Sequence, residues 1–388
     1  MEKRNRMGKT VLYVTNYYKE DVINQRHSKP FISQAGQNKG KYIMDVLKEG
    51  GNKVITWSNA WTSGRSFRFY KGFQSTLEEN LYYASIFGAP VLNSLSCYVS
   101  SKCFLKRYLR SHTLDAMIIY NMRLENSLLA LYAKKHYGIP VILQYEDGLT
   151  VDSHINGIKR LVYGKMEKKV FDCLDGAFLV NSRIKVPCPA VVIRGAMREQ
   201  NKTAEFPLLN GTPKLLFSST LDAQRGVNVL LEALKYTDAD FNLKITGRGD
   251  MEEAVKACKD PRVQFLGYLD YETYQKELEQ TDICINAQLA QHEFAEFSFP
   301  SKIFEYLSYG KLVVSSDMAD VEEGLGGAVL VYHEDSPKQL AAAIEEAIAI
   351  KRDVSRNEQY GKAVRDIVEE NSIARVAKKV NDLLDKVR

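Results

Sequence analysis

Long apolar runs, paired cysteines and a strong charge of either sign are all missing from this chain of 388 residues. No segment approaches the roughly 20 apolar residues that a membrane-spanning helix needs. The six cysteines lack the close spacing of a zinc site, and we interpret them as buried thiols in a reducing cytoplasm. The net charge of +5 is small for this length, which argues against a nucleic-acid-binding protein. It leaves room for a locally basic face toward an anionic substrate or a membrane.

Length and composition predict two soluble domains. A chain of this length exceeds what one hydrophobic core usually organises. Hydrophobic residues make up 45% and charged residues 26%, which is typical of a soluble globular protein. The apolar run at 11–14 is too short for the core of a signal peptide and is interpreted as a first strand. We therefore expect a cytoplasmic protein that could associate with the inner face of the membrane.

The first half of the chain alternates strands and helices. Strands are predicted at 10–15, 53–57, 116–120, 141–145, 177–180 and 191–193. Helices are predicted around 42–47, at 124–135 and at 158–171, with loops at 16–29 and 33–41. The strand at 141–145 leads directly into Glu146 and Asp147, at the strand end where α/β sheets bind ligands.

Residues 60–112 are less regular. An extra strand is expected at 66–73, followed by a mostly helical stretch at 77–109 that is interrupted near 88–90. Lys102, Lys106 and Arg110 are four residues apart, with apolar side chains on another side. Such a helix can lie on an anionic membrane surface. It can also pack on its own domain with a solvated basic face, which is the commoner use.

The second half repeats the alternation. Strands are predicted at 215–218, 243–246, 263–266, 283–285, 313–315 and 328–331, with helices at 227–234, 252–258, 271–279 and 304–309. The remainder is mostly helical, and 373–387 is an amphipathic terminal helix. We predict an α/β fold with one domain at 1–195, a second at 196–370, and a helix at 371–388 that packs back on the first.

The stretch 298–310 has the features of a phosphate-binding turn. Pro300 fits the first turn of a helix, Ser298 could cap that helix, and Gly310 could end it. A helix N-terminus next to Lys302 is a site where a phosphate can bind. Glu305 lies one turn further on and is better suited to sugar hydroxyls, because like charges repel.

Two other loops are predicted at the same sheet edge. Ser219 and Thr220 follow one strand, and Arg225 lies just before the next helix. The two hydroxyls, the guanidinium and the free amides of that helix could all bind the same anion. Gly247 and Gly249 follow the next strand, although the third glycine of a dinucleotide-binding fingerprint is missing. The aspartates at 238 and 240 precede a strand and so face the opposite edge. We therefore predict a phosphorylated ligand, no metal site and no resident cofactor.

Four blocks, at 216–234, 243–249, 263–286 and 300–317, resemble family 4 glycosyltransferases of the GT-B fold, of the retaining, polysaccharide-biosynthesis type. The most specific block reads Pro-Ser-Lys-Ile-Phe-Glu-Tyr-Leu-Ser-Tyr-Gly from Pro300 to Gly310. The first domain resembles the family only loosely. The resemblance implies two Rossmann-like domains that face each other across a cleft.

The resemblance also implies a substrate class. A nucleotide-diphosphate sugar, expected to be a UDP-sugar, would bind the second domain, and a glycan or lipid-linked glycan acceptor would bind the first. Transfer would be metal-independent and would retain the anomeric configuration. The expected catalytic residues are Glu146, Asp147, Arg225 and Lys302. The expected donor-binding residues are Ser219, Thr220, Gly247, Gly249, Gly267, Tyr268, Glu296, Ser301 and Glu305.

Two departures from the family pattern leave other functions open. Phe297 stands where the family has a first glutamate, with Glu296 one place away, and Ser219-Thr220 replaces the usual Gly-Arg. Lys302 could take the place of that arginine. A sugar-nucleotide epimerase, a phosphorylase-like enzyme or a non-catalytic nucleotide-sugar-binding subunit remain alternatives to a glycosyltransferase.

Overall fold

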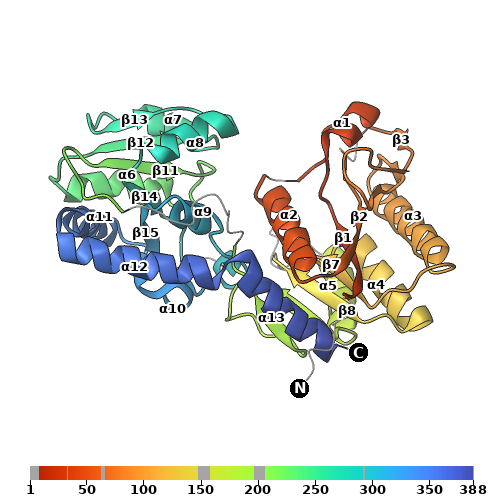
Figure 1. Ribbon diagram of the computed structural model, residues 1–388. Coiled ribbons are helices and arrows are strands. Elements are labelled where there is room, and N and C mark those ends of the chain that lie inside the picture. Colours follow the sequence, from red (N-terminus) through yellow and green to blue (C-terminus); the bar gives the residue numbers. More distant parts are fainter. Residues whose placement is uncertain are drawn as a thin grey trace, which may run out of the picture. The chain divides into compact units, whose positions relative to one another are not determined.

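The computed structural model describes residues 8–32, 34–62, 66–146, 158–195, 206–291 and 293–387. Contacts between residues divide the chain into two compact α/β units (Figure 1). The first unit consists of Met1–Val180, Ile184–Ile193 and Ile373–Arg388. The second consists of Asn181–Arg183 and Arg194–Ser372.

An eight-stranded sheet forms the centre of the first unit, in the order β10-β9-β8-β7-β1-β2-β5-β4. Its strands are β1 (Thr10–Thr15), β2 (Lys53–Ser58), β4 (Phe73–Gln74), β5 (Leu81–Tyr83), β7 (Ala116–Tyr120), β8 (Val141–Tyr145), β9 (Gly176–Leu179) and β10 (Ala190–Val192). All neighbours pair in parallel except the edge strand β4, which is antiparallel to β5. The central strands carry side chains buried on both faces, as the apolar runs predict.

A separate antiparallel pair, β3 (Phe69–Tyr70) and β6 (Ile86–Phe87), lies beside the sheet edge that β4 and β5 form. The helices of this unit are α1 (Glu20–Arg26), α2 (Gln34–Glu49), α3 (Leu92–Tyr108), α4 (Leu124–Tyr137), α5 (Ile158–Phe171) and α13 (Ile373–Lys386). Helix α13 packs against α2 (Figure 1), where Asn381 donates to Gly50 O (2.7 Å) and accepts from Asn52 (2.8 Å). The predicted return of the terminal helix to the first unit is confirmed.

Three local predictions for this unit are wrong. The expected loop at 16–29 contains α1, and the expected loop at 33–41 is already the first half of α2. The expected helical stretch at 77–109 is β5 and β6 before α3 begins at Leu92. Here tertiary pairing decides the structure, because Leu81 and Tyr83 are buried where β5 adds to the edge of β2.

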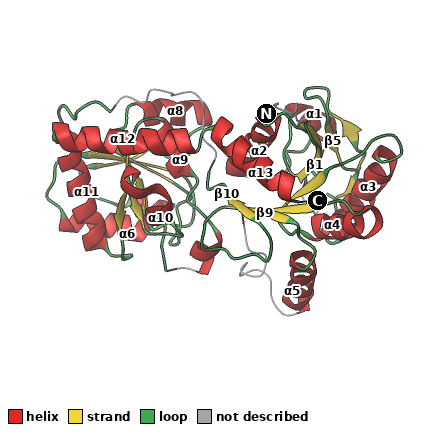
Figure 2. Ribbon diagram, turned by 60° about the horizontal axis from the view of Figure 1, so that its bottom comes forward, coloured by secondary structure: helices red, strands yellow, loops and turns green. Residues whose placement is uncertain are grey.

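The second unit has a parallel six-stranded sheet in the order β13-β12-β11-β14-β15-β16, with helices packed against it (Figure 2). Its strands are β11 (Lys214–Ser218), β12 (Asn242–Thr246), β13 (Val263–Phe265), β14 (Ile283–Asn286), β15 (Leu312–Ser316) and β16 (Leu330–Tyr332). Its helices are α6 (Val227–Ala233), α7 (Glu252–Lys256), α8 (Tyr271–Glu279), α9 (Lys302–Ser308), α10 (Val321–Leu325), α11 (Pro337–Arg352) and α12 (Val354–Glu370). The strand order reverses between β11 and β14, and ligands bind at such points in open α/β sheets.

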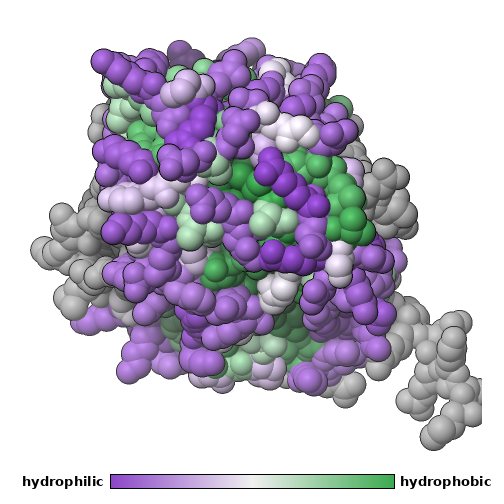
Figure 3. Space-filling view, turned by 90° about the vertical axis from the view of Figure 1, so that its left-hand side faces the viewer, coloured by the Kyte–Doolittle hydropathy of each residue, from purple (hydrophilic) through white to green (hydrophobic). Residues whose placement is uncertain are grey.

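The surface in Figure 3 is seen from the side of Figure 1 where α11 lies, and it is mostly hydrophilic with smaller apolar areas between the polar side chains. Among the described residues, no helix combines the length and the hydropathy required to cross a bilayer.

Candidate functional site

The start of α9 lies beside the reversal point of the second sheet. Helix α9 runs from Lys302 to Ser308, and Pro300 O accepts from Ile303 N (3.0 Å) in the turn before it. The predicted cap is wrong: Ser298 lies outside the helix, and its carbonyl accepts from Asn181 (3.1 Å). Gly310 follows the helix with φ of 67°, as predicted for its end.

Lys302 connects α9 to the carboxyl end of β11. Its ammonium donates to the carbonyl of Ser218 (2.7 Å) and to the hydroxyl of the same residue (3.0 Å). Lys302 as a whole residue is exposed, but its ammonium is partly desolvated where it contacts Ser218. This desolvation lowers the pKa of Lys302 to about 8; Glu305 opposes the shift and Arg225 adds to it. Two cations therefore lie close enough to repel each other at this strand end.

Arg225 is held between the loops that follow β11 and β14. Its backbone N–H donates to Asp222 (2.8 Å), and its guanidinium donates to Gln288 in the β14 loop. Gly226 adopts φ of 74°, and a Cβ there would lie 1.8 Å from the carbonyl oxygen of Ala287. Only glycine permits this approach. Gln288 was not anticipated from the sequence, because a single glutamine after a strand carries no recognisable pattern.

Gly247 and Gly249 allow the loops after β11 and β12 to pack together. A Cβ at Gly247 would lie 1.8 Å from Ser219 O, and one at Gly249 would lie 2.4 Å from Leu221 O. Ser219 N donates to Thr246 O (3.2 Å), while Thr220 is exposed. These two glycines therefore have a structural reason that is independent of any ligand.

Glu305 is oriented by two tyrosines of α8. Tyr274 donates to Oε2 of Glu305 (3.1 Å) and Tyr271 donates to Oε1 (3.4 Å). Gly267 and Tyr268 lie in the loop before α8, where Tyr268 is 68% exposed and stacks under the guanidinium of Arg248 (4.7 Å). The two tyrosines of α8 were not predicted from the sequence, although their spacing of three residues places them on one helix face.

Glu296 and Ser301 lie in the segment that leads into α9. Glu296 is an exposed residue of a 3₁₀ helix at Glu293–Phe297, and its carbonyl accepts from the buried Asn181 (3.1 Å). Ser301 is the residue before α9, and its side chain makes no capping hydrogen bond. Phe297, at the position of the missing glutamate, is half-buried.

In the first unit, Glu146 belongs to a hydrogen-bonded polar cluster at the end of β8. Its carboxylate accepts from Gln144 (2.7 Å), and its backbone N–H donates to Asn121 (2.8 Å). The ammonium of Lys39 lies 3.9 Å from that carboxylate. Burial lowers the pKa of Lys39, and Glu146 opposes this. Lys39 was missed because its segment was interpreted as a loop, and Asp147 lies outside the described residues.

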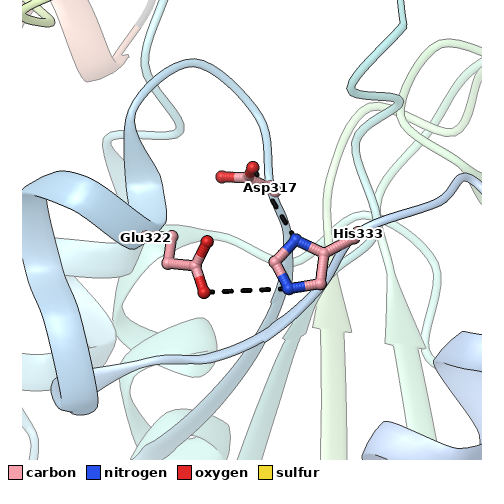
Figure 4. Close-up of side chains that lie close together, drawn as sticks. All are labelled: Asp317, Glu322 and His333. Carbon is pink, nitrogen blue, oxygen red and sulfur yellow. Dashed lines mark ion pairs between the residues drawn. The ribbon is translucent and has the colours of Figure 1, made fainter.

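Asp317, Glu322 and His333 come together where β15 and β16 end (Figure 4). His333 lies 3.9 Å from Asp317 and 3.7 Å from Glu322, and the three ligand atoms lie within 4.8 Å of one another. A cation could use such a group. However, His333 and Glu322 are more than half exposed, and the guanidinium of Arg183 already lies 3.9 Å from Asp317. We interpret the group as surface ion pairs.

Comparisons with known proteins agree with this architecture. The family model described as "Glycosyl transferases group 1" matches residues 212–349. No curated protein matches the sequence closely enough to count as a relative. Solved structures match at low identity, so they show the fold alone.

Three of these structures cover almost the whole chain. Sucrose-phosphate synthase from Thermosynechococcus elongatus is 13% identical, with a TM-score of 0.70 over 97% of this chain and 98% of the other. A glycosyltransferase from Rickettsia africae is 17% identical, with a TM-score of 0.65 over 98% of both chains. Anabaena HepE, solved in complex with UDP, is 13% identical, with a TM-score of 0.64 over 97% and 99%.

The family match and the shared fold agree with each other. Residues 212–349, which lie in the second unit, match the group 1 glycosyl transferases, and the whole chain has the GT-B fold. The resemblance stated from the four sequence blocks is confirmed.

Proposed function

We propose that the protein transfers a sugar from a UDP-sugar to a glycan or a lipid-linked glycan, without a metal and with retention of the anomeric configuration. The observation that carries this proposal is the meeting of Lys302 and Arg225 at the carboxyl end of β11. Among the residues that the structure describes, neither cation pairs with a carboxylate. An anion such as a diphosphate would relieve their mutual repulsion.

The other donor contacts follow from this position. Glu305, held by Tyr271 and Tyr274, is the group that would accept hydrogen bonds from the ribose. Tyr268 is exposed beside Arg248 and would stack on the base. That UDP is bound by a protein of the same fold, Anabaena HepE, supports UDP as the nucleotide. Ser219, Thr220, Gly267, Glu296 and Ser301 remain proposed contacts.

In the transition state, negative charge develops on the departing diphosphate. Lys302 and Arg225 would stabilise that charge, and their fixed positions mean that little reorganisation is needed. Glu146 accepts a hydrogen bond from Gln144 and lies near the ammonium of Lys39. It is the proposed contact for the acceptor or the reacting sugar. Asp147 is proposed for the same role.

Thermal stabilisation by nucleotide sugars tests the proposal. We expect UDP-sugars to raise the Tm of the purified protein more than GDP- or dTDP-sugars do. Product analysis then separates the alternatives: conversion of the donor without an acceptor indicates an epimerase, and tight binding without transfer to any acceptor indicates a binding subunit. No stabilisation by any nucleotide sugar would overturn the proposal.

The low pKa of Lys302 predicts that donor affinity depends on pH. Above about pH 8 the ligand-free protein loses the Lys302 proton, so binding must restore it and the affinity falls. We expect the Kd of a UDP-sugar to be constant near pH 6.5–7 and to rise by up to about tenfold per pH unit above pH 8. Calorimetry between pH 6.5 and 9 measures this, with Lys302→Arg as a control whose charge is permanent. If the Kd of the UDP-sugar depended on pH equally in the wild type and in Lys302→Arg, Lys302 would be excluded as the titrating group.

Glu305→Ala should weaken UDP binding while leaving the fold intact. Hydrogen bonds to a charged group contribute about 1.5–3 kcal/mol, so the Kd of UDP should rise by roughly 10- to 150-fold. The matched control is Glu272→Ala, which removes an exposed carboxylate of α8. Undiminished UDP affinity in the Glu305 variant would remove this residue from the site.

Metal independence predicts that transfer continues after chelation. Since Lys302 and Arg225 provide the positive charge for the diphosphate, we expect the rate in EDTA to stay within about twofold of the untreated rate. The rate is measured with and without added Mg²⁺. A loss that Mg²⁺ restores would contradict this part of the proposal.

A further inference from the structure

Helix α3 exposes several large apolar side chains, while part of its buried side is polar. Its buried side includes Asn93, Ser94, Cys97, Ser101 and Leu105. Leu92, Leu95 and Val99 are 48%, 49% and 51% exposed, and their spacing places them along one side of the helix. Contiguous exposed apolar side chains mark binding surfaces more often than isolated ones do.

These exposed side chains line a cavity of about 800 Å³ in the first unit. The cavity lies between α3, the sheet edge at β4 and β5, and the β3–β6 pair, in the region of Figure 1 where α3 and β3 are labelled. Its apolar lining includes Trp57, Phe69, Phe73, Leu95, Val99 and Phe104. The volume falls within the range of about 300–1,000 Å³ that small-molecule sites occupy.

The serine hydroxyls of the cavity wall already have partners. Ser85 Oγ accepts from Gly72 N (2.8 Å), Ser96 Oγ accepts from Phe87 N (2.9 Å), and Ser100 Oγ accepts from Ser85 N (2.9 Å). A ligand therefore need not satisfy these groups. A wall of this kind fits a hydrocarbon chain better than a sugar, whose hydroxyls would lose their hydrogen bonds to water.

Among the described residues that line the cavity, Arg107 is the one basic side chain. The stretch 81–114 contains no Asp or Glu and carries four basic residues, Lys102, Lys106, Arg107 and Arg110. Lys102 and Lys106 lie 4.5 and 5.9 Å from the ring of Tyr132 on α4. Arg107 instead lines the cavity and is exposed, and no carboxylate pairs with it in the described part of the chain. Its guanidinium is available to an anion beside the apolar wall.

We propose that this cavity binds the hydrocarbon chain of a phosphate-bearing lipid, with the phosphate at Arg107. The role of that lipid as the carrier of the acceptor rests on the proposed function. The binding itself is a property of the first unit.

Calorimetric titration with dodecyl phosphate below its critical micelle concentration tests the inference, and Trp57 in the wall provides a fluorescence signal. We expect saturable binding to the wild type, at least tenfold tighter than that of inorganic phosphate. Val99→Asp should weaken binding at least tenfold, because it places a charge in the apolar wall. Arg107→Glu should weaken the binding of dodecyl phosphate at least tenfold and leave the binding of uncharged dodecyl maltoside unchanged.

Two controls match these substitutions. Val354→Asp changes a valine that is 65% exposed in the second unit, and Lys378→Glu reverses an exposed charge on α13. Both control variants should bind dodecyl phosphate as the wild type does. Loss of binding in the two cavity variants together with unchanged binding in the two controls supports the inference.

Three outcomes would overturn the inference: no saturable binding to the wild type, equal binding by the Val99 variant, or self-association in sedimentation that Val99→Asp abolishes. The last would identify a second copy of the chain as the occupant. UDP affinity is measured on every sample. Retained UDP binding without lipid binding contradicts the inference alone, and lipid binding without UDP binding contradicts the proposed function alone.

Discussion

Lys302→Ala and Arg225→Ala should each lower kcat/KM for the nucleotide sugar by about 10²–10³-fold, which is the effect of removing one preorganised donor from a developing negative charge. Lys302 reaches the end of β11 from α9, and Arg225 is fixed by Gln288 from the β14 loop. Both cations are in place before the ligand arrives. We therefore expect kcat to fall as well as KM to rise, since the charge on the diphosphate grows as the sugar bond breaks.

Steady-state kinetics of the two single variants and of the double variant measure this effect. The losses should be less than additive, because both side chains act on the same diphosphate. The matched control is Lys276→Ala, which removes an exposed ammonium of α8 and should leave the kinetics within about twofold of the wild type. Unchanged donor kinetics in both single variants would exclude the assignment.

The sequence predicted the second unit better than the first. The predicted strands of the second unit overlap observed ones, because buried parallel strands appear as short apolar runs between turn residues. Lys302, Arg225 and Glu305 could be chosen because each lies in a short segment of unusual composition: a proline before a helix, Arg-Gly before a helix, and a carboxylate one turn further on. The glycines at 247 and 249 were singled out for a ligand, yet the loops require them in any case.

The residues that were missed act through contacts distant in sequence. Tyr271 and Tyr274 matter because α8 brings them to Glu305, 34 and 31 residues away. Lys39 matters because α2 places it beside Glu146 at the end of β8. The segment 77–109 was predicted to be mostly helical, but its first part pairs with β2 as the strand β5, and the helix begins only at Leu92. The cavity under α3 depends on that same strand and could not be anticipated.

Asp320→Ala should produce a large loss of stability in the second unit. Asp320 is fully buried, and its carboxylate accepts from the guanidinium of Arg194 (2.6 Å) and from the N–H and hydroxyl of Ser182 (both 2.7 Å). Gly324 of α10 leaves room for that guanidinium, since a Cβ there would lie 2.3 Å from Nε. Removing one partner of a buried ion pair costs about 3–5 kcal/mol. At roughly 2–4 °C per kcal/mol for a unit of this size, Tm should fall by on the order of 10 °C.

The difference in stability between the wild type and Asp320→Ala should also depend on pH, and it should shrink as the pH falls. Burial raises the pKa of Asp320, but Arg194 and the two hydrogen bonds from Ser182 outweigh it and lower that pKa below the usual value. The ion pair therefore contributes its full stability above about pH 4, where the unfolded carboxyl is ionised, and loses it as the pH falls through the lower folded pKa. Thermal unfolding from pH 7 to pH 3 should show that the Tm difference between wild type and Asp320→Ala shrinks only at the acid end.

The matched control is Asp366→Ala, an exposed change on α12, which should leave Tm within about 1 °C at every pH. A Tm difference that stayed constant down to pH 3 would mean that lost packing, and not the ion pair with Arg194, accounts for the destabilisation.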